Sequence, residues 1–285
     1  MNNVIDGGFK TDTGQPWSRD YIRIVSWNIE RGLRFPAIVD FLSSIEADLI
    51  LLQEVDRNAR RTEYRDVARE LAHSLGLNYV FGTEFQELSE GSERWPAYHG
   101  MATLSPWPLT NGRIVRFQHQ SGFWEPRWYV PRIGLFQRRL GGRIALVSDA
   151  LIYRERLTSY NLHLESRGKE VLRLRQLREA LEDSKRRTDS SLVVLGGDFN
   201  LNAGNGDAAG MLRGDGFHDA VRLPEVPTTA PGVPFHRARS IDWIYISSEV
   251  HLEGLVHNNI QASDHYPVSA RFAVSGTASK QATAS

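Results

Sequence analysis

Seven carboxylate, amide or histidine side chains stand beside apolar runs of this sequence, where strands of a sheet are expected to end. An apolar run that meets one polar residue is typical of a buried strand that delivers a side chain to the edge of a sheet. Such side chains, gathered at one edge, could bind a cation and activate a water molecule. The residues are Asn28, Glu54, Asp198, Asn200, Asp242, Asp264 and His265.

The residue types of this set favour a hard cation. Oxygen ligands dominate and histidine is in the minority, which suits Mg²⁺ or Mn²⁺ better than zinc. The chain has no cysteine, so thiolate nucleophiles, disulfides and cysteine zinc sites are excluded. Singly, each residue has an ordinary explanation: a solvated loop charge at Glu54, a turn at 197–200, a cap at 263–265. The recurrence of the pattern in one chain favours a common site.

The elements that must position these residues alternate between strands and helices. Helices are predicted over residues 35–46, 64–75 and 166–187, because each places apolar residues on one face, and Gly76 is expected to cap the second helix. Strands mixed with helices at this spacing predict a layered α/β sandwich. The predicted strands, several of them apolar throughout, are residues 22–27, 49–55, 78–82, 143–148, 159–164, 192–195 and 241–246.

Composition places the chain among ordinary globular proteins and excludes some classes of function. Lys+Arg and Asp+Glu are both 34, which argues against a protein that grips nucleic acid through a broad basic surface but leaves room for a local basic groove. No secretory signal and no membrane-spanning run is visible, so a soluble, cytoplasmic protein is the default expectation. We expect a flexible arm over residues 1–20, one catalytic domain over 21–274 and a flexible tail over 275–285.

Six short segments occur in a fixed order along the chain. They are Ser26-Trp27-Asn28, Leu52-Gln53-Glu54-Val55, Asn161-Leu162-His163-Leu164, Gly197-Asp198-Phe199-Asn200, Ile241-Asp242-Trp243-Ile244 and Ser263-Asp264-His265-Tyr266-Pro267-Val268. Any one is a weak signal, but their order and spacing resemble the endonuclease/exonuclease/phosphatase superfamily over residues 22–272. The resemblance implies a four-layered α/β/β/α sandwich of the deoxyribonuclease I type, with a metal site at one end.

The resemblance also implies roles for individual residues. Glu54 would be the principal metal ligand, with Asn28 beside it and Asp264 near the metal. Asp198 would orient and deprotonate the attacking water, and Asn200 would hold that water or the phosphate.

Two histidines complete the implied site. His265, oriented by Asp242, would contact the phosphoryl oxygens, and His163 would be a second donor to the phosphate. Hydrolysis of a phosphate ester needs these parts: an in-line water, neutralised phosphoryl oxygens and a stabilised leaving group.

Two departures from the family pattern stand out. Residues 98–105 resemble the tyrosine-containing strand of the family, which implies that Tyr98 lies near the site, but Met101 stands where many relatives have asparagine. Residues 149–158 look inserted between strands that relatives join more directly. The insertion either reshapes the substrate mouth or forms a longer hairpin, and we favour the hairpin.

The substrate stays open at this level. Residues 123–129 are rich in aromatics and could stack nucleobases, with packing in an edge strand or loop as the alternative. The basic residues of the helix at 166–187 are expected to form its solvated face, whereas Arg237 and Arg239 are better placed to touch a phosphate.

Three functions follow from this reading. The first is a monomeric phosphodiesterase that acts on DNA or RNA. The second is a hydrolase of phospholipids, resembling sphingomyelinases, or of inositol phosphates. The third, disfavoured by the intact set of polar residues, is a catalytically silent binding module.

Overall fold

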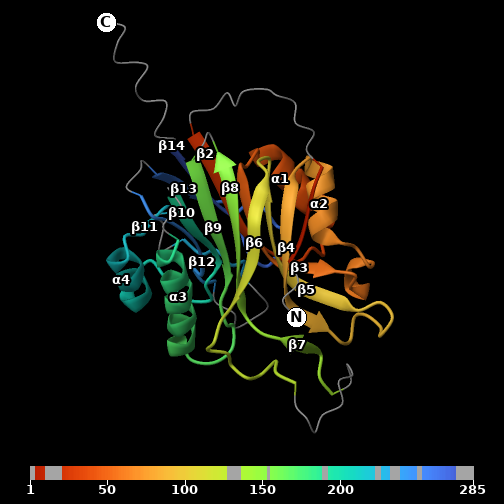
Figure 1. Ribbon diagram of the computed structural model, residues 1–285. Helices are drawn as coiled ribbons and strands as arrows, with labels where there is room; N and C mark the ends of the chain where they lie inside the picture. Colours follow the sequence, from red (N-terminus) through yellow and green to blue (C-terminus); the bar gives the residue numbers. More distant parts are fainter. Residues whose placement is uncertain are drawn as a thin grey trace, which may run out of the picture.

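Two β-sheets lie face to face at the centre of the molecule (Figure 1). The computed structural model describes residues 4–9, 21–126, 136–152, 155–187, 192–221, 226–231, 238–248 and 252–273. In the described part of the chain the first sheet has the order β1-β4-β5-β3-β2-β14-β13, with β7 also paired to β4, and the second has the order β11-β12-β10-β9-β8-β6.

The bounds of the elements are as follows. The first sheet contains β1 (Val4–Gly8), β2 (Tyr21–Arg31), β3 (Leu49–Arg57), β4 (Asn78–Glu87), β5 (Ala97–Ser105), β7 (Arg139–Gly141), β13 (Leu252–Val256) and β14 (Val268–Ala273). The second contains β6 (Leu109–Arg116), β8 (Ile144–Ile152), β9 (Glu155–His163), β10 (Leu192–Asp198), β11 (His218–Asp219) and β12 (Asp242–Ile246). The helices are α1 (Phe35–Ile45), α2 (Val67–Leu75), α3 (Glu170–Lys185) and α4 (Gly206–Gly214), with a 3₁₀ turn at Arg60–Thr62.

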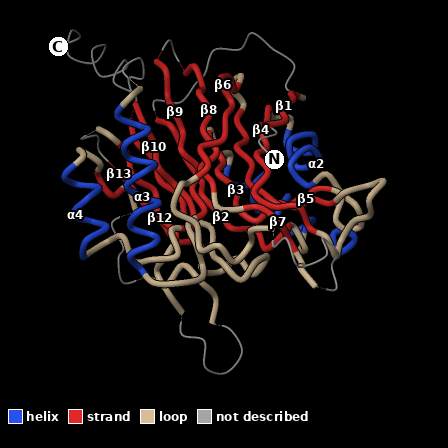
Figure 2. Tube along the Cα trace, turned by 60° about the horizontal axis from the view of Figure 1, so that its bottom comes forward, coloured by secondary structure: helices blue, strands red, loops and turns tan. Residues whose placement is uncertain are grey.

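Helices cover the outer face of each sheet, so the predicted four-layered sandwich is confirmed (Figures 1 and 2). α1 and α2 bury Phe41 and Leu71 against the outer face of the first sheet. α3 and α4 bury Leu177 and Leu212 against the outer face of the second. A third layer of apolar side chains, among them Leu51 and Val194, fills the space between the sheets. Each strand of the sandwich centre is therefore buried on both faces, which explains the continuous apolar runs.

The helix boundaries follow local signals. α1 begins at a proline-containing turn, where the missing N–H of Pro36 costs no hydrogen bond. α2 begins three residues later than predicted, because Tyr64 has a φ of +61° and the Asp66 side chain accepts from the Arg69 N–H as an N-cap. It ends at Gly76 in the left-handed conformation, as expected.

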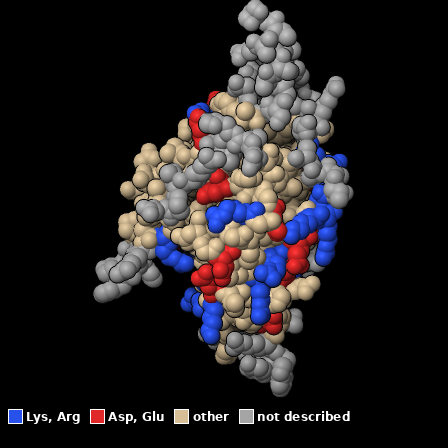
Figure 3. Space-filling view, turned by 90° about the vertical axis from the view of Figure 1, so that its left-hand side faces the viewer, with Lys and Arg blue, Asp and Glu red and all other residues tan. Residues whose placement is uncertain are grey.

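Most basic residues of α3 lie on its solvated face, as predicted, but Arg173 is half-buried and donates to the Glu165 carbonyl at 2.7 Å. The helix begins at Glu170 and buries Gln176, Leu177, Ala180 and Leu181. Figure 3 shows lysine and arginine side chains interspersed with acidic ones on the α3 and α4 side of the molecule, without a patch of one sign. This face carries no broad basic surface.

The N-terminal arm is not flexible throughout, contrary to expectation. Val4–Gly8 form β1, which pairs antiparallel with β4 from Val4↔Gly82 to Gly8↔Asn78. Val4 packs between the sheets and Ile5 packs against the core beneath α1 and α2. The strand was missed because backbone pairing, rather than a long apolar pattern, holds this short edge segment. Residues 10–20 and the predicted tail at 275–285 lie outside the described residues.

The inserted stretch at 149–158 forms a hairpin, as favoured. β8 and β9 pair antiparallel from Ala145↔Leu162 to Ile152↔Glu155. No helix in the described part of the chain is long and apolar enough to cross a membrane.

Candidate active site

Three neighbouring strands of the second sheet bring predicted site residues into register. Asp198, the last residue of β10, lies beside His163 of β9 on one side and Asp242 of β12 on the other. Residues paired across adjacent strands point to the same face of a sheet. All three side chains are buried at this edge. Gly197 permits the close approach, because its φ is +148° and a Cβ there would lie 1.9 Å from the Leu162 carbonyl oxygen.

Asp198 is the centre of the cluster. Its Oδ1 accepts from the backbone N–H of Asn200 at 2.8 Å, and its Oδ2 accepts from Asn28 Nδ2 at 3.3 Å. The Nε2 atoms of His163 and His265 lie 3.8 and 3.9 Å from Oδ2. One carboxylate oxygen thus faces an amide and two imidazoles contributed by β2, β9 and the segment before β14.

His265 is held by a buried carboxylate behind it. Its Nδ1 lies 2.9 Å from Asp242 Oδ2, which also accepts from Thr228 Oγ1 at 2.6 Å. Burial by itself lowers the pKa of His265, but the charges of Asp242 and Asp198 outweigh it and raise that pKa to about 10. His265 is therefore an imidazolium at neutral pH, with Nε2 as its remaining donor. Burial also raises the pKa of Asp242, the carboxyl group that pairs with His265.

Glu54 reaches the site because β3 is irregular. Strict alternation would place Glu54 with Leu52, on the face covered by α1 and α2. The register between β3 and β5 shifts between Leu52 and Val55, and Glu54 has a φ of +52°. The bulge re-aims the side chain. Burial raises the pKa of Glu54, but the basic side chains around it, Arg31 and Arg143 among them, together hold that pKa well below its ordinary value.

His163 differs from His265 in its surroundings. Its Nδ1 lies 3.2 Å from Glu84 Oε2, and its Nε2 lies 2.8 Å from Arg143 Nη1. An arginine can only donate, so the network fits a neutral imidazole that accepts at Nε2 and donates from Nδ1. Arg143 also forms an ion pair with Glu84 Oε1 at 3.0 Å. Sequence reasoning missed both Glu84 and Arg143. The signal was Arg143 at the start of a predicted strand, since arginine is rarely buried without a partner.

Tyr98 does not join the cluster. Side chains in a strand alternate between its two faces, so Tyr98 and Ala102, four residues apart in β5, point to the same face. Ala102 packs in the core beneath α1 and α2, and Tyr98 therefore points away from the second sheet. His99 points instead into the space between the sheets, where its Nδ1 lies 2.8 Å from Asp56 Oδ1. The prediction chose the wrong neighbour, because an alternating pattern cannot tell which face is functional. Met101, on the same face as His99, packs between the sheets with Val80 and Leu146.

Asn200 and Asp264 take different positions. Asn200 has a φ of +52°, and its Nδ2 donates to the Leu164 carbonyl at 3.1 Å, so it ties the end of β9 to the loop after β10. Asp264 is exposed, and its Oδ1 accepts from Ser263 Oγ at 3.2 Å. Arg239 Nη2 donates to the Asn200 carbonyl at 3.2 Å, whereas Arg237 lies outside the described residues.

Two groups of side chains could hold a cation. Asp198, Asp242 and His265 offer ligand atoms within 4.8 Å of one another, but an imidazolium has no lone pair to give. Glu54 is ionised, and its one ion pair in the described residues is a 3.5 Å contact with Arg31. The buried Nε2 of His99 has no hydrogen-bond partner among the described residues. The carboxylate and the orphaned nitrogen fit a site for a divalent cation beside Glu54.

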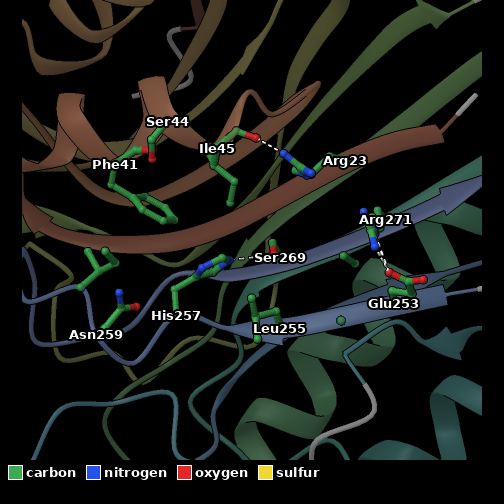
Figure 4. A pocket seen from close by; sticks show the side chains of 13 residues that line it. Arg23, Phe41, Ser44, Ile45, Glu253, Leu255, His257, Asn259, Ser269 and Arg271 are labelled. Atoms are coloured by element: carbon green, nitrogen blue, oxygen red, sulfur yellow. Dashed lines mark hydrogen bonds and ion pairs between the residues drawn. The ribbon is translucent and has the colours of Figure 1, made fainter. Parts of the chain in front are cut away.

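A pocket of about 560 Å³ opens at Glu54 and Arg143. A second pocket, of about 610 Å³, lies between α1 and the β13–β14 pair (Figure 4). Its polar groups bind one another: Arg23 donates to the Ile45 carbonyl, His257 pairs with Ser269, and Arg271 pairs with Glu253. This second pocket contains no residue of the candidate site. The pocket at Glu54 adjoins the site, because its lining residue Arg143 contacts His163.

Comparisons with known proteins agree with this geometry. The sequence profile of the Endonuclease/Exonuclease/phosphatase family matches residues 25–265. An endonuclease/exonuclease/phosphatase from Beutenbergia cavernae has a similar structure, with a TM-score of 0.65, 20% identity, and coverage of 90% of this chain and 72% of that one. Truncated TDP2 from Caenorhabditis elegans gives a TM-score of 0.60, 18% identity, and coverage of 89% and 98%.

A third similar structure is an endonuclease/exonuclease/phosphatase family protein from Leptotrichia buccalis, with a TM-score of 0.63, 16% identity, and coverage of 89% of this chain and 100% of that one. At these identities the structural similarity shows the fold alone. A comparison with curated protein sequences finds no match. The profile match spans most of the chain and confirms the resemblance seen in its motifs. The chain belongs to the endonuclease/exonuclease/phosphatase family, whose members generally hydrolyse phosphoester bonds.

Proposed function

We propose that the protein is a divalent-metal-dependent phosphodiesterase whose preferred substrate is nucleic acid. The observation that carries the proposal is the position of Asp198 Oδ2, within 4 Å of Asn28 Nδ2 and of the Nε2 atoms of two histidines. Asn28 and the His265 imidazolium are donors beside this carboxylate, and His163 carries the charge of Arg143 at its Nε2. This arrangement suits a reaction in which one group takes a proton from water while others neutralise charge on a phosphoryl group.

Asp198 acts as the general base. Its Oδ1 is fixed by the Asn200 N–H, which leaves Oδ2 to accept the proton of the attacking water. Asn28 and Asn200 orient Asp198 and that water. General-base catalysis by a positioned carboxylate typically contributes ~10²–10⁴-fold.

His265 donates from Nε2 to a phosphoryl oxygen. Asp242 sets its orientation through Nδ1, and the charge on the imidazolium offsets the negative charge that develops as the phosphate ester bond breaks. Arg143 adds a fixed positive charge next to His163.

Glu54, with Asn28 beside it, would hold Mg²⁺ or Mn²⁺, and exposed Asp264 would be a further oxygen ligand. When bound, the cation supplies Lewis acidity and stabilises the leaving oxygen. The preference for oxygen ligands in this set supports a hard cation.

The first test replaces the proposed base. Asp198→Asn keeps the shape of the side chain and should lower kcat for bis(p-nitrophenyl) phosphate with Mg²⁺ by at least ~10²-fold. Asp40→Asn, an exposed change on the outer face of α1, is the matched control and should leave kcat unchanged. Equal turnover by Asp198→Asn and wild type, with matching circular dichroism spectra, would overturn the assignment of the base.

The second test compares substrates. Plasmid DNA, sphingomyelin and inositol phosphates are offered side by side, with Mg²⁺ and with EDTA. Nicking of DNA that EDTA abolishes is the expected result. Cleavage of sphingomyelin or release of phosphate in preference to DNA would move the assignment to the lipid or inositol phosphate class. Failure of all three with bound metal would favour a binding module.

A further inference from the structure

The pocket beside Glu54 combines arginines with aromatic rings. Its aromatic lining consists of Phe123, Trp124 and Phe136, and its basic lining of Arg31, Arg138, Arg139, Arg143 and Arg167. Among the lining residues that the structure describes, Glu54 is the one acidic group. The pocket is joined to the reaction centre through Arg143, which lies against His163.

Two of the rings are presented to solvent. Phe123 is 44% exposed and Phe136 is 61% exposed. The Phe123 and Trp124 rings pack edge to face at a centroid distance of 4.5 Å, and this contact restricts the orientation of Phe123. The Arg167 guanidinium lies 4.2 Å from the Phe123 centroid. Exposed rings gathered in one pocket are uncommon on a surface that binds nothing.

Three of the five arginines have a carboxylate partner, and one of these is Arg31, 3.5 Å from Glu54. Arg139 and Arg143 are neutralised by buried carboxylates, Glu87 at 2.8 Å and Glu84 at 3.0 Å. Arg138 and Arg167 form no ion pair with a carboxylate in the described residues, and Arg167 instead stacks on aromatic rings. The pocket thus offers two uncompensated positive charges beside exposed aromatic rings.

We propose that this pocket is a subsite for a nucleotide unit next to the scissile phosphate. The nucleobase stacks on Phe123 and Phe136, and the flanking phosphate binds Arg138 and Arg167. Bases stack on aromatic side chains and on guanidinium planes. An inositol phosphate offers no flat ring to stack on the phenyl groups. The quaternary ammonium of a choline headgroup could bind over aromatic rings, but the positive charges of Arg138 and Arg167 in the same pocket would repel it. The inference rests on the proposed phosphodiesterase function and names the part of the substrate that the pocket selects.

The kinetic test uses two substrates with the same leaving group. Thymidine 5′-(p-nitrophenyl phosphate) carries a base, and methyl p-nitrophenyl phosphate does not. The wild type should prefer the nucleotide in kcat/KM. Phe123→Leu, which keeps an apolar side chain but removes the ring, should reduce that preference about 10-fold, within the ~5- to 100-fold range for loss of one stacked base. Arg167→Gln should reduce it less.

The matched control is Arg178→Gln, an exposed arginine of α3 outside this pocket. It should keep the wild-type preference. A loss of preference in Arg178→Gln equal to that in Phe123→Leu, or no loss in either, would overturn the subsite.

A binding measurement separates this inference from the proposed function. Calorimetry in EDTA compares thymidine 5′-monophosphate with ribose 5-phosphate, which lacks the base, on wild type and Phe123→Leu. Tighter binding of the nucleotide to wild type alone supports the subsite even if the enzyme cleaves neither chromogenic ester, which would refute only the proposed reaction. Equal affinities of the two ligands for wild type, or of the nucleotide for both proteins, would refute the subsite while leaving any hydrolysis by Asp198 intact.

Discussion

His265 and His163 approach the same oxygen of Asp198, at 3.9 and 3.8 Å, yet their surroundings differ. Each has a carboxylate at Nδ1, Asp242 for His265 and Glu84 for His163. In front of His163 stands Arg143, whose guanidinium occupies Nε2. The surroundings of the second ring nitrogen, Nε2, therefore decide the role of each histidine. A free Nε2, as in His265, can donate to substrate, whereas the Nε2 of His163 is bonded to Arg143 and stabilises the structure of the site.

The largest expected effect comes from the histidine with the free nitrogen. His265→Gln should lower kcat for bis(p-nitrophenyl) phosphate by ~10³-fold, because the charged donor to the phosphoryl oxygen is lost. The unfolding midpoint in urea should fall as well, because buried Asp242 loses its charged partner, so kcat is compared in buffer in which both proteins are folded. His73→Gln, on the exposed face of α2, controls for loss of a histidine. If His163→Gln reduced kcat as much as His265→Gln does, the contrast between the two pairs would fail.

The pair around His163 should instead matter for stability. Glu84→Gln leaves buried Arg143 without its closest carboxylate, and breaking a buried ion pair typically costs ~3–5 kcal/mol. Because Glu165 lies 3.9 Å from Arg143 and retains part of the compensation, we expect the lower end of that range in urea unfolding. A Glu84→Gln variant as stable as wild type would show that the contacts among Glu84, Arg143 and His163 do not stabilise the fold.

The lowered pKa of Glu84 also predicts how the stability of the protein depends on pH. Burial raises the pKa of Glu84, but His163 and Arg143 outweigh it and lower the pKa from 4.5 to about 2. A carboxylate whose pKa is lower in the folded state stabilises that state at pH values above its pKa in the unfolded chain. This contribution is lost as the pH falls through the pKa of the folded state. The contribution, on the order of 3 kcal/mol, should therefore be present above pH 4.5 and be lost between pH 4.5 and 2.

The measurement compares wild type with Glu84→Gln. Urea midpoints of the two proteins should converge as the pH falls from 6 towards 2. A constant difference across this range would contradict the assignment of the depressed pKa to Glu84.

The smallest effect expected is on metal affinity. Glu54→Gln removes the charge but keeps the bulged backbone, and it should weaken Mn²⁺ binding by ~10–100-fold, within the range found for loss of groups that support a metal site. Electron paramagnetic resonance of free Mn²⁺ measures this without turnover. His265→Gln should leave Mn²⁺ affinity nearly unchanged. The reverse order would assign the cation to the Asp198–Asp242–His265 cluster.

The sequence by itself determined the layers and most of the reaction centre. The apolar run that ends at Asp198 and the one that begins at Asp242 predict strands buried on both faces, and in adjacent antiparallel strands these two positions meet at one edge. Periodicity predicted α1, α2 and α3, because their contacts are local and leave a repeating pattern. The motifs also predicted that Asn28 and His265 meet Asp198.

Only the tertiary structure decided the direction of the remaining side chains. A bulge in β3 turns Glu54 towards the site, and the choice between Tyr98 and His99 depends on which face of β5 meets the second sheet. Glu84 lies in β4 and Arg143 in the turn between β7 and β8, 59 residues apart in the sequence, so no local pattern predicts their pairing. The periodicity of apolar residues indicates which positions of a strand are buried. It does not indicate which face of the strand lines a pocket, because this depends on how the two sheets pack against each other.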